Sequence, residues 1–160
     1  MTITVGDKLP EATLVEMTES GPSPRTTDDI FGGRKVALFS VPGAFTPTCS
    51  AKHLPGFIEQ SEVFKAKGVD EIVCMAVNDA FVMGAWGKSQ GAGGKVSLLS
   101  DGNGDFSKAL GLEMDGRAYS MGMRGQRFSM IVENGVVTAL NIEGPGEFHV
   151  SSADHMLSQL

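Results

Sequence analysis

VALFSVPGAFTPTCSAKH, residues 36–53, leads from a continuous apolar run through two prolines to a cysteine. The apolar run, residues 36–41, has the composition of a strand that is buried on both faces of a sheet. A second run of this kind, IVCMAV, occupies residues 72–77, and the residues between the two runs carry helically spaced apolar positions up to Gly68. We therefore predict a βαβ unit, in which a right-handed helical crossover joins two parallel strands.

The rest of the chain adds antiparallel structure to this unit. Asn134 and Gly135 lie between two apolar runs, which is the strongest short-range signal for a β-hairpin with a type I′ turn. The other predicted elements are a helix over 79–90, a strand over 96–99, a short helix over 106–110, and a final helix that Ser151 or Ser152 caps and that ends at Leu160. This order predicts an α/β, thioredoxin-like fold, with a central mixed β-sheet flanked by helices in a single domain over residues 1–160.

Composition limits the class of protein. At 160 residues the chain has the size of one domain. Its net charge of -6 and the lack of any basic run argue against nucleic acid as a partner, because phosphates attract clustered Lys and Arg. The first residues lack the pattern of a signal peptide, and no apolar stretch approaches the ~18 residues of a membrane span. We expect a cytoplasmic protein that does not bind a membrane.

Cys49, one of two cysteines, stands where the first strand is expected to give way to a helix. Pro47 and Thr48 suit a helix start, so the cysteine falls in the first turn, near backbone N–H groups that have no partner within the helix. A helix N-terminus contributes at most about 2 kcal/mol to a nearby negative charge, whereas an activated thiolate needs roughly 3.4 kcal/mol. A cation is therefore expected within reach of the sulfur.

Arg127 is the cation that the topology favours. It immediately precedes the apolar run FSMIV, and a strand antiparallel to residues 36–41 begins at the sheet edge where residues 36–41 end. Arg124 is the nearest competitor, but it falls in the preceding turn, where the sheet positions it less well. The alternative for Arg127 is a pairing with a surface carboxylate.

Thr46 lies three residues before Cys49, in the place of the first cysteine of a C-x-x-C redox motif. A dithiol exchange of the thioredoxin kind is therefore not available at this position. A threonine hydroxyl accepts one hydrogen bond while it donates another, which suits the orientation of a small O–O substrate beside a sulfur. The alternative role is that of a turn or cap residue.

The pattern P-x-x-x-T-x-x-C, formed by Pro42, Thr46 and Cys49, is similar to the active-site signature of peroxiredoxins. The longer stretch VPGAFTPTCSAKHLPGF resembles the type II, or peroxiredoxin-five-like, subfamily. The resemblance continues through VNDAFVMGAW, KVSLLSDGNGDFSKALGL and RFSMIVENGVV, so it extends over nearly the whole chain. It implies a thioredoxin-fold thiol peroxidase that reduces hydrogen peroxide and small organic hydroperoxides, with a role in antioxidant defence and redox homeostasis.

The resemblance also implies roles for individual residues. Cys49 is the expected peroxidatic cysteine, whose thiolate attacks a peroxide oxygen and becomes a sulfenic acid. Thr46 and Arg127 are expected to bind the peroxide and the transition state, and Pro42 to shield the thiolate from water. No metal or other cofactor is expected, since an external thiol supplies the electrons. The resemblance further implies a homodimer formed near the active-site loops.

Cys74 lies within the second apolar run, about three residues before its end and thus roughly 10 Å from the edge of the sheet. A disulfide requires Cα atoms within about 7 Å, which favours a buried apolar role and allows a resolving role only if the first helical turn unwinds. Some type II relatives carry a resolving cysteine near the C-terminus, but residues 144–160 contain none. The sulfenic acid is then reduced by glutathione or glutaredoxin directly, which we favour, or through a Cys49–Cys74 disulfide that thioredoxin reduces.

Several other residues are candidates for the site. His53 follows Cys49 by one helical turn, which allows a catalytic base, but the stretch has no third group that would orient the imidazole. Gly43, Phe45 and His53 are candidates for the wall of a substrate pocket. Four aromatic residues either line an approach to the thiol or a dimer contact, or belong to the core: Phe45, Phe81, Trp86 and Phe128. The other two histidines show no spacing typical of a zinc site and are expected at the surface.

Two other classes of function are alternatives to the peroxidase. One is a redox-regulated binding or chaperone protein that senses peroxide through Cys49 without sustained turnover. The other is a disulfide oxidoreductase, which the missing C-x-x-C motif disfavours. Steady consumption of peroxide in the presence of an added thiol donor distinguishes the peroxidase from the sensor.

Overall fold

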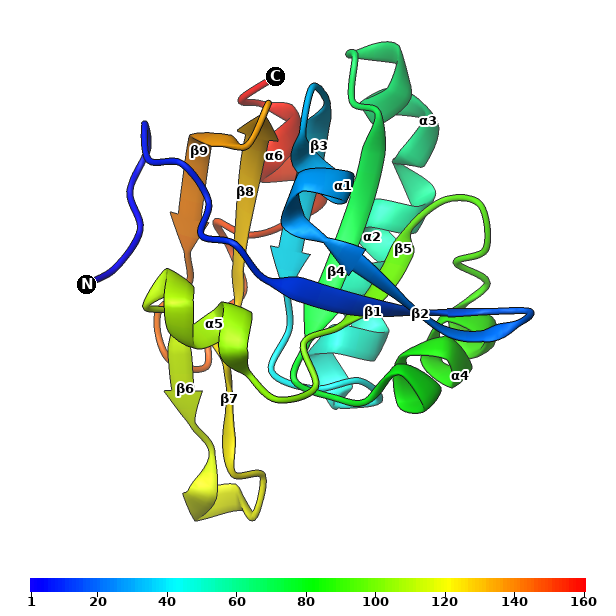
Figure 1. The fold of residues 1–160 in the computed structure, drawn as a ribbon, viewed down its shortest axis with the longest axis vertical. Helices are drawn as coiled ribbons and strands as arrows, with labels where there is room; N and C mark the ends of the chain where they lie inside the picture. Colours follow the sequence, from blue (N-terminus) through cyan, green and yellow to red (C-terminus); the bar gives the residue numbers. More distant parts are fainter.

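The computed structural model describes residues 1–160 and has a seven-stranded mixed β-sheet at its centre, with strand order β2-β1-β5-β4-β3-β8-β9 (Figure 1). The strands of this sheet are β1 (Thr13–Thr18), β2 (Gly21–Thr26), β3 (Lys35–Ser40), β4 (Glu71–Ala76), β5 (Ser97–Ser100), β8 (Phe128–Glu133) and β9 (Val136–Ile142). A separate pair consists of β6 (Glu113–Asp115) and β7 (Met123–Gly125). The helices are α1 (Thr27–Phe31), α2 (Leu54–Glu59), α3 (Ser61–Ala66), α4 (Ala80–Gln90), α5 (Asp105–Leu110) and α6 (Ala153–Leu157), with a π-helical turn η1 (Cys49–His53) and a 3₁₀ turn η2 (Arg117–Tyr119).

The predicted βαβ unit is confirmed, because β3 and β4 pair in parallel. Side chains of β3 alternate between two cores: Val36 and Leu38 belong to one, Ala37 and Phe39 to the other. Each of these four residues is fully buried, which explains why the strand has a continuous rather than an alternating apolar pattern.

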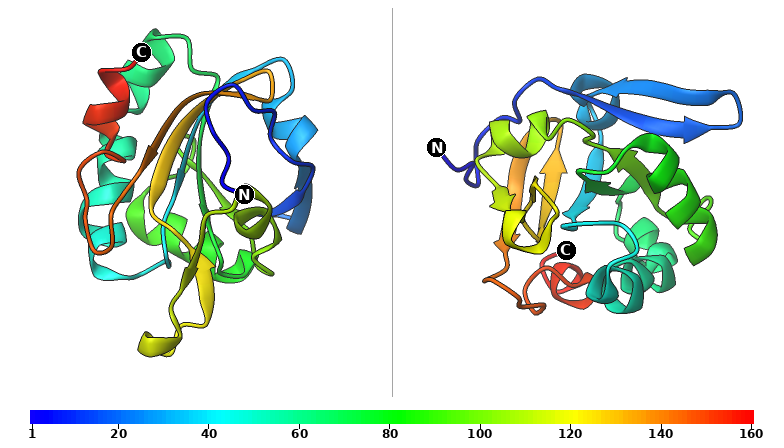
Figure 2. Two further views of the ribbon diagram at one scale, coloured as in Figure 1. Left: turned by 90° about the vertical axis from the view of Figure 1, so that its left-hand side faces the viewer. Right: turned by 90° about the horizontal axis from the view of Figure 1, so that it is seen from below.

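Helices cover both faces of the sheet (Figure 2). One face of the sheet is covered by α1, α5 and the N-terminal residues. The other face is covered by α2, α3, α4 and α6. The arm formed by β6, η2 and β7 extends beyond the body of the molecule (Figure 1). None of the helices has the length and apolar character that a membrane span needs.

The crossover between β3 and β4 is not the single helix that the apolar spacing predicts. It consists of η1, α2 and α3, and the chain leaves the helical conformation at Gln60, where φ is -94° and ψ is 6°. Pro55 has no N–H with which to continue the α-helical ladder, and the π-helical turn directly precedes it. The prediction of a single helix was wrong because the apolar spacing continues through Gln60 to Gly68 and carries no signal for the interruption.

The β8–β9 hairpin is confirmed. Asn134 and Gly135 have φ values of 47° and 77°, the two positive values that a type I′ turn requires. The helix predicted over 79–90 is α4, with the Asp79 side chain accepting from the N–H of Val82. Smaller shifts occur elsewhere: β5 lies one residue later than predicted, α5 begins one residue earlier, and α6 ends at Leu157 rather than Leu160.

The N-terminal hairpin of β1 and β2 is an element that the sequence patterns did not predict. Its second strand, GPSPRT, contains two prolines and lies at the outer edge of the sheet, where a missing N–H costs no ladder hydrogen bond. The short β6–β7 pair also goes unpredicted, because strands of three residues carry little periodic signal. Neither omission alters the position of Cys49 at the carboxyl end of β3.

Candidate active site

Cys49 lies in the first turn of the helical segment after β3, as predicted. The helical conformation begins at Pro47, and the N–H of Ser50 donates to the carbonyl of Thr46 over 3.0 Å. In the π-helical turn η1, the N–H of Leu54 donates to the carbonyl of Cys49. Such turns are rare and frequently occur at functional sites.

Arg127 reaches Cys49 from the neighbouring strand. Because β8 runs antiparallel to β3 with Phe128 opposite Ser40, residue 127 lies where β3 ends. The Nη2 of Arg127 donates to the Sγ of Cys49 over 3.1 Å. No carboxylate forms an ion pair with Arg127. The positive charge of the guanidinium is therefore directed at the sulfur rather than neutralised by an acidic partner.

Arg124, the competing cation, contacts other groups. Its Nε donates to the carbonyl of Met121 over 2.8 Å, and its Nη1 donates to the carbonyl of Pro42 over 3.3 Å. These bonds connect the β6–β7 arm to the loop that precedes Cys49. Arg124 thus positions that loop, and Arg127 contacts the sulfur.

Burial strengthens the interaction between Arg127 and Cys49. The cysteine has 0% exposed surface, so water does not screen the charge of the guanidinium from the sulfur. The guanidinium therefore supplies the sulfur with a hydrogen-bond donor and a positive charge that water does not screen. The sulfur is both buried and in contact with Arg127.

The loop between β3 and η1 is held by hydrogen bonds from both sides. The Oγ1 of Thr46 donates to the carbonyl of Gly43 over 2.7 Å, which leaves the lone pairs of the hydroxyl free to accept from a ligand. The N–H of Ala44 donates to Oδ1 of Asn78 over 2.9 Å. Phe45 takes a left-handed conformation with φ of 65°, which is uncommon for a residue other than glycine and is typical of strained functional loops.

The four candidate aromatic residues divide into two pairs. Trp86 and Phe128 are fully buried, and the Nε1 of Trp86 donates to Oγ of Ser50 over 3.0 Å, next to the cysteine. Phe45 is 54% exposed and Phe81 is 67% exposed, which is unusual for large apolar side chains. The first pair therefore belongs to the core, and the second lies on the surface, with Phe45 on the loop that precedes Cys49.

His53 contacts Arg127 rather than lining an open pocket. Its ring is fully buried, Nδ1 lies 2.8 Å from Nη1 of Arg127, and Nε2 lies 2.9 Å from the carbonyl of Ser151. Burial, together with the charge of Arg127, lowers the pKa of His53 from 6.5 to about 3. Because the guanidinium occupies the only free lone pair, His53 is not placed to accept a proton as a catalytic base.

The sequence offered no signal for the loop over residues 143–151, which encloses Arg127 and His53. The ring of Phe148 lies 4.9 Å from the ring of His53 and 5.9 Å from the guanidinium carbon of Arg127. Oε2 of Glu143 accepts from the N–H of His149 over 2.6 Å, and from the N–H and Oγ of Ser151 over 2.9 and 2.6 Å. An isolated glutamate after a strand resembles a surface residue in sequence, and only the folded loop reveals its burial.

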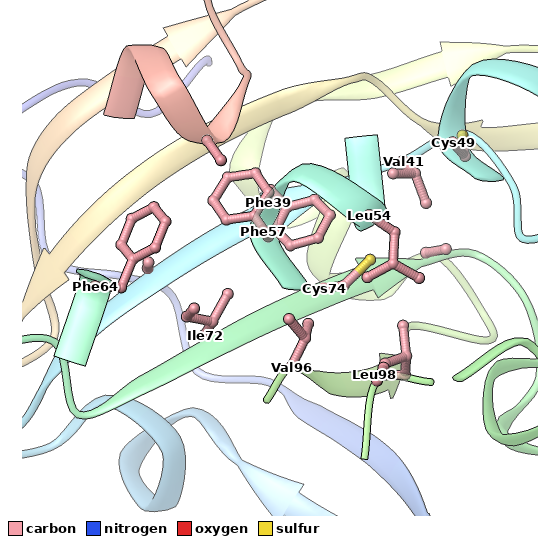
Figure 3. Close-up of a cluster of buried hydrophobic side chains, with 14 of the residues drawn as sticks. Phe39, Val41, Cys49, Leu54, Phe57, Phe64, Ile72, Cys74, Val96 and Leu98 are labelled. Atoms are coloured by element: carbon pink, nitrogen blue, oxygen red, sulfur yellow. The ribbon is translucent and has the colours of Figure 1, made fainter. Parts of the chain in front are cut away.

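Cys74 lies within the sheet, opposite Phe39 on β3, and is fully buried as a free thiol. Burial raises its pKa well above the usual range, with the neighbouring Cys49 acting in the same direction. In Figure 3 its sulfur lies beside Leu54 and Phe57, apart from Cys49 at the end of the cluster. A thiol in this environment reacts slowly as a nucleophile.

The other two histidines form no metal site. His149 is exposed and His155 is partly buried. No three His, Cys, Asp or Glu side chains converge in a group that could hold a metal ion.

Comparison with known proteins connects this geometry to a family. A redoxin family model matches residues 4–157. The sequence is 47% identical over 159 residues to Peroxiredoxin-2B of Arabidopsis thaliana, and the match covers 99% of this chain and 98% of that protein. The chain belongs to the peroxiredoxin family. This peroxiredoxin is also 51% identical over 164 residues to the chloroplastic Peroxiredoxin-2E-2 of Oryza sativa subsp. japonica, with coverage of 99% and 73%.

Solved structures agree with the sequence relatives. The crystal structure of reduced Prx3 in complex with H2O2 from Vibrio vulnificus superposes on this peroxiredoxin with a TM-score of 0.95, at 51% identity and with 99% of each chain covered. The predicted thioredoxin-like fold and type II peroxiredoxin class are confirmed. The protein is accordingly a thiol peroxidase, an oxidoreductase that transfers electrons from thiols to peroxides.

Proposed function

We propose that Cys49 is the peroxidatic residue and that Arg127 and Thr46 stabilise the transition state of its reaction with hydrogen peroxide and small organic hydroperoxides. The thiolate sulfur attacks one peroxide oxygen in line, the O–O bond breaks, and the sulfur becomes a sulfenic acid. The other oxygen leaves with the electron pair of that bond and takes a proton to become water or an alcohol. The contact of 3.1 Å between Arg127 Nη2 and Cys49 Sγ carries this proposal.

Each group near the sulfur has a separate task in the proposed step. The guanidinium of Arg127 stabilises the thiolate before the attack and the negative charge on the departing oxygen during it. Thr46, whose proton is committed to Gly43, accepts a hydrogen bond from the peroxide and so aligns its O–O bond with the sulfur. Pro42 shields the sulfur from water. No metal or other cofactor takes part in this proposed mechanism.

We favour glutathione or glutaredoxin as the reductant of the sulfenic acid. A glutathione thiol attacks the sulfenic sulfur, releases water and leaves a mixed disulfide, which a second thiol then reduces to the Cys49 thiol. The burial of Cys74 in the sheet supports this route over an internal disulfide for thioredoxin. A Cys49–Cys74 disulfide would require η1 to unwind.

Mass spectrometry after one equivalent of hydrogen peroxide tests this proposal. In the absence of glutathione, the expected product is Cys49 with one added oxygen; in its presence, a glutathione adduct. Cys74→Ser is expected to retain turnover supported by glutaredoxin, whereas Cys49→Ser loses the reaction with peroxide. A 49–74 disulfide as the main product, or loss of turnover in folded Cys74→Ser, would overturn the favoured reductant but not the peroxidatic role of Cys49.

Consumption of a single equivalent of peroxide in the presence of an added thiol would contradict the proposed turnover and favour the peroxide sensor.

We place the proposed enzyme in the cytoplasm, where glutathione keeps thiols reduced, as a homodimer that serves antioxidant defence and redox homeostasis. The exposed rings of Phe45 and Phe81 beside the active-site loop support the dimer. Neither nucleic acid nor a membrane is a proposed partner. Microscopy of the tagged protein tests the location.

A further inference from the structure

The contacts behind Arg127 form a continuous chain that ends at a buried carboxylate. Arg127 contacts His53, His53 contacts the carbonyl of Ser151, and Ser151 donates twice to Glu143. Glu143 also returns to the start of the chain, because its N–H donates to the carbonyl of Arg127 over 3.0 Å. Both ends of the arginine, its backbone and its guanidinium, are therefore tied to the loop that Glu143 organises.

These contacts determine the tautomer of His53. A guanidinium only donates hydrogen bonds, so Nδ1 of His53 must accept from Nη1 of Arg127. A carbonyl only accepts, so Nε2 must carry the proton and donate to Ser151. Both contacts are satisfied only by the neutral ring with hydrogen on Nε2. Rotation of the ring or the other tautomer would break both bonds.

A neutral partner has an electrostatic advantage at this position. A carboxylate beside Arg127 would orient the guanidinium but would also neutralise its charge. The neutral His53 orients the guanidinium and leaves its full positive charge for the sulfur of Cys49. Glu143 has a negative charge, but it accepts from Ser151 and His149 instead of pairing with Arg127.

Glu143 is well placed to hold the Ser151 carbonyl in position. The residue is 7% exposed, and one carboxylate oxygen accepts from three donors of the loop. The other oxygen, Oε1, is buried without a partner, a costly arrangement that the folding of the loop must outweigh. Between residues 143 and 151 the chain has no helix or strand, so these three bonds determine where the Ser151 carbonyl lies.

We infer that Glu143 is a positioning residue for the peroxidase reaction: by fixing the Ser151 carbonyl it sets the His53 tautomer and thereby directs the Arg127 guanidinium at Cys49. The inference rests on the proposed role of Arg127. Glu143 acts without contact with the sulfur or the peroxide. A small misalignment of a charged group at a reacting centre costs up to about a hundredfold in rate.

The test compares Glu143→Ala with two matched variants. Glu143→Gln retains an acceptor for the three donors and places its amide nitrogen where Oε1 has no partner. Glu147→Ala removes an exposed carboxylate from the same loop. The measured quantity is the rate constant for hydrogen peroxide reacting with the prereduced protein, followed by stopped flow. This rate constant is expected to fall about tenfold or more in Glu143→Ala and to stay within about threefold of wild type in Glu143→Gln. It is expected to be unchanged in Glu147→Ala.

The nitrogen-15 resonances of the His53 ring give a readout that a purely structural role of Glu143 would not move. The wild-type protein is expected to show the tautomer with hydrogen on Nε2, and folded Glu143→Ala a mixture of forms. A wild-type rate in folded Glu143→Ala, or a lost rate with an unchanged His53 tautomer, would overturn the inference. Wild-type protein that fails to consume peroxide would instead refute the proposed function, since the resonances are measured without peroxide.

Ser151→Ala keeps the test decisive if Glu143→Ala does not fold. This variant removes one of the three bonds to Glu143 but retains the backbone N–H and the carbonyl that His53 contacts. A smaller loss of rate, about threefold, is expected together with a partial shift of the His53 tautomer. Unchanged resonances in Ser151→Ala would contradict the inference.

Discussion

At the scale of single residues, the site depends on how a buried sulfur acquires a positive neighbour. Cys49 and Arg127 are both predictable from sequence, the first from its place after a strand and two prolines, the second from the direction of the β8 strand. The contacts of His53 are not predictable, since its partners lie 74 and 98 residues away along the chain. Sequence spacing suggested a contact with Cys49, whereas the ring is directed at Arg127.

Thr46 provides a prediction at this scale. Thr46→Val removes the hydroxyl that would accept from the peroxide and is expected to lower the rate of the peroxide step by about tenfold, the value of a hydrogen bond between neutral groups. Thr46→Ser retains the hydroxyl and is expected to stay within about threefold of wild type. Stopped-flow kinetics on prereduced protein measures both, and equal rates for Val and Ser would contradict the role of the hydroxyl.

His53 provides a second prediction, on stability against pH. Its pKa in the folded protein, about 3, lies below the value of 6.5 for an exposed histidine, so the unfolded chain binds more protons between these values. The contribution of neutral His53 to the free energy of unfolding is therefore fully present above pH 6.5. It is lost as pH falls toward 3, by at most about 5 kcal/mol. Urea unfolding at several pH values should show this loss.

His53→Gln is the matched control for that measurement. The Gln amide can accept from Arg127 and donate to Ser151 but does not titrate, so its unfolding free energy should fall less steeply between pH 6.5 and 4. The same steepness in both proteins would mean that His53 is not the group responsible.

At the scale of elements, segments with a strong local sequence signal were predictable and segments shaped by tertiary contacts were not. The β3 and β4 runs and the Asn134–Gly135 hairpin carry their information locally. By contrast, β2 contains two prolines and forms only because β1 offers it an edge, and the loop over 143–151 takes its shape from a buried carboxylate. The crossover is interrupted at Gln60, between α2 and α3, although its apolar spacing continues through that residue.

The anchoring of the N-terminal hairpin gives a prediction at the element scale. Arg25 on β2 donates two hydrogen bonds to Glu71 at the start of β4, at 2.8 and 2.9 Å. Burial opposes ionisation of Glu71, but hydrogen bonds from Arg25 and Ser97 and the charge of Arg25 outweigh it and lower the pKa from 4.5 to about 2. The unfolded chain therefore binds more protons between pH 2 and 4.5, and stability falls as pH decreases through that window.

Glu71→Gln is expected to lose about 1–2 kcal/mol of stability at pH 7, less than the full shift implies because partly exposed arginines are screened by solvent. The difference from wild type should shrink as pH falls from 4.5 toward 2, which thermal or urea unfolding can follow. A difference that stays constant over that range would show that the Glu71 charge contributes nothing.

At the scale of the whole molecule, two cores on opposite faces of one sheet hold the site at an edge where three segments meet. The loop after β3, the start of β8 and the loop over residues 143–151 each supply one part, and the arm of β6 and β7 is tied to the first of them through Arg124. Phe45, on the loop after β3, and Phe81, on α4, are both exposed and are the residues on which the proposed dimer rests.

The proposed homodimer is testable at this scale. Phe81→Asp introduces a charge where the partner would pack and is expected to shift the protein from dimer to monomer in sedimentation velocity, by a factor of ten or more in the dissociation constant, which is about 1.4 kcal/mol. Val63→Asp serves as the control, because Val63 is also an exposed apolar residue but lies on a different helix, α3. This variant should leave the assembly unchanged. A monomeric wild-type protein at micromolar concentration would refute the dimer.

The central claim is that Arg127 activates Cys49, and the rate constant for hydrogen peroxide reacting with prereduced Arg127→Gln tests it most directly. Loss of the charge and of the bond to the sulfur is expected to slow the reaction by about a hundredfold to a thousandfold. Arg124→Gln, which alters a cation that does not touch the sulfur, should lose much less. A folded Arg127→Gln that reacts at the wild-type rate, or that loses no more than Arg124→Gln, would contradict the account.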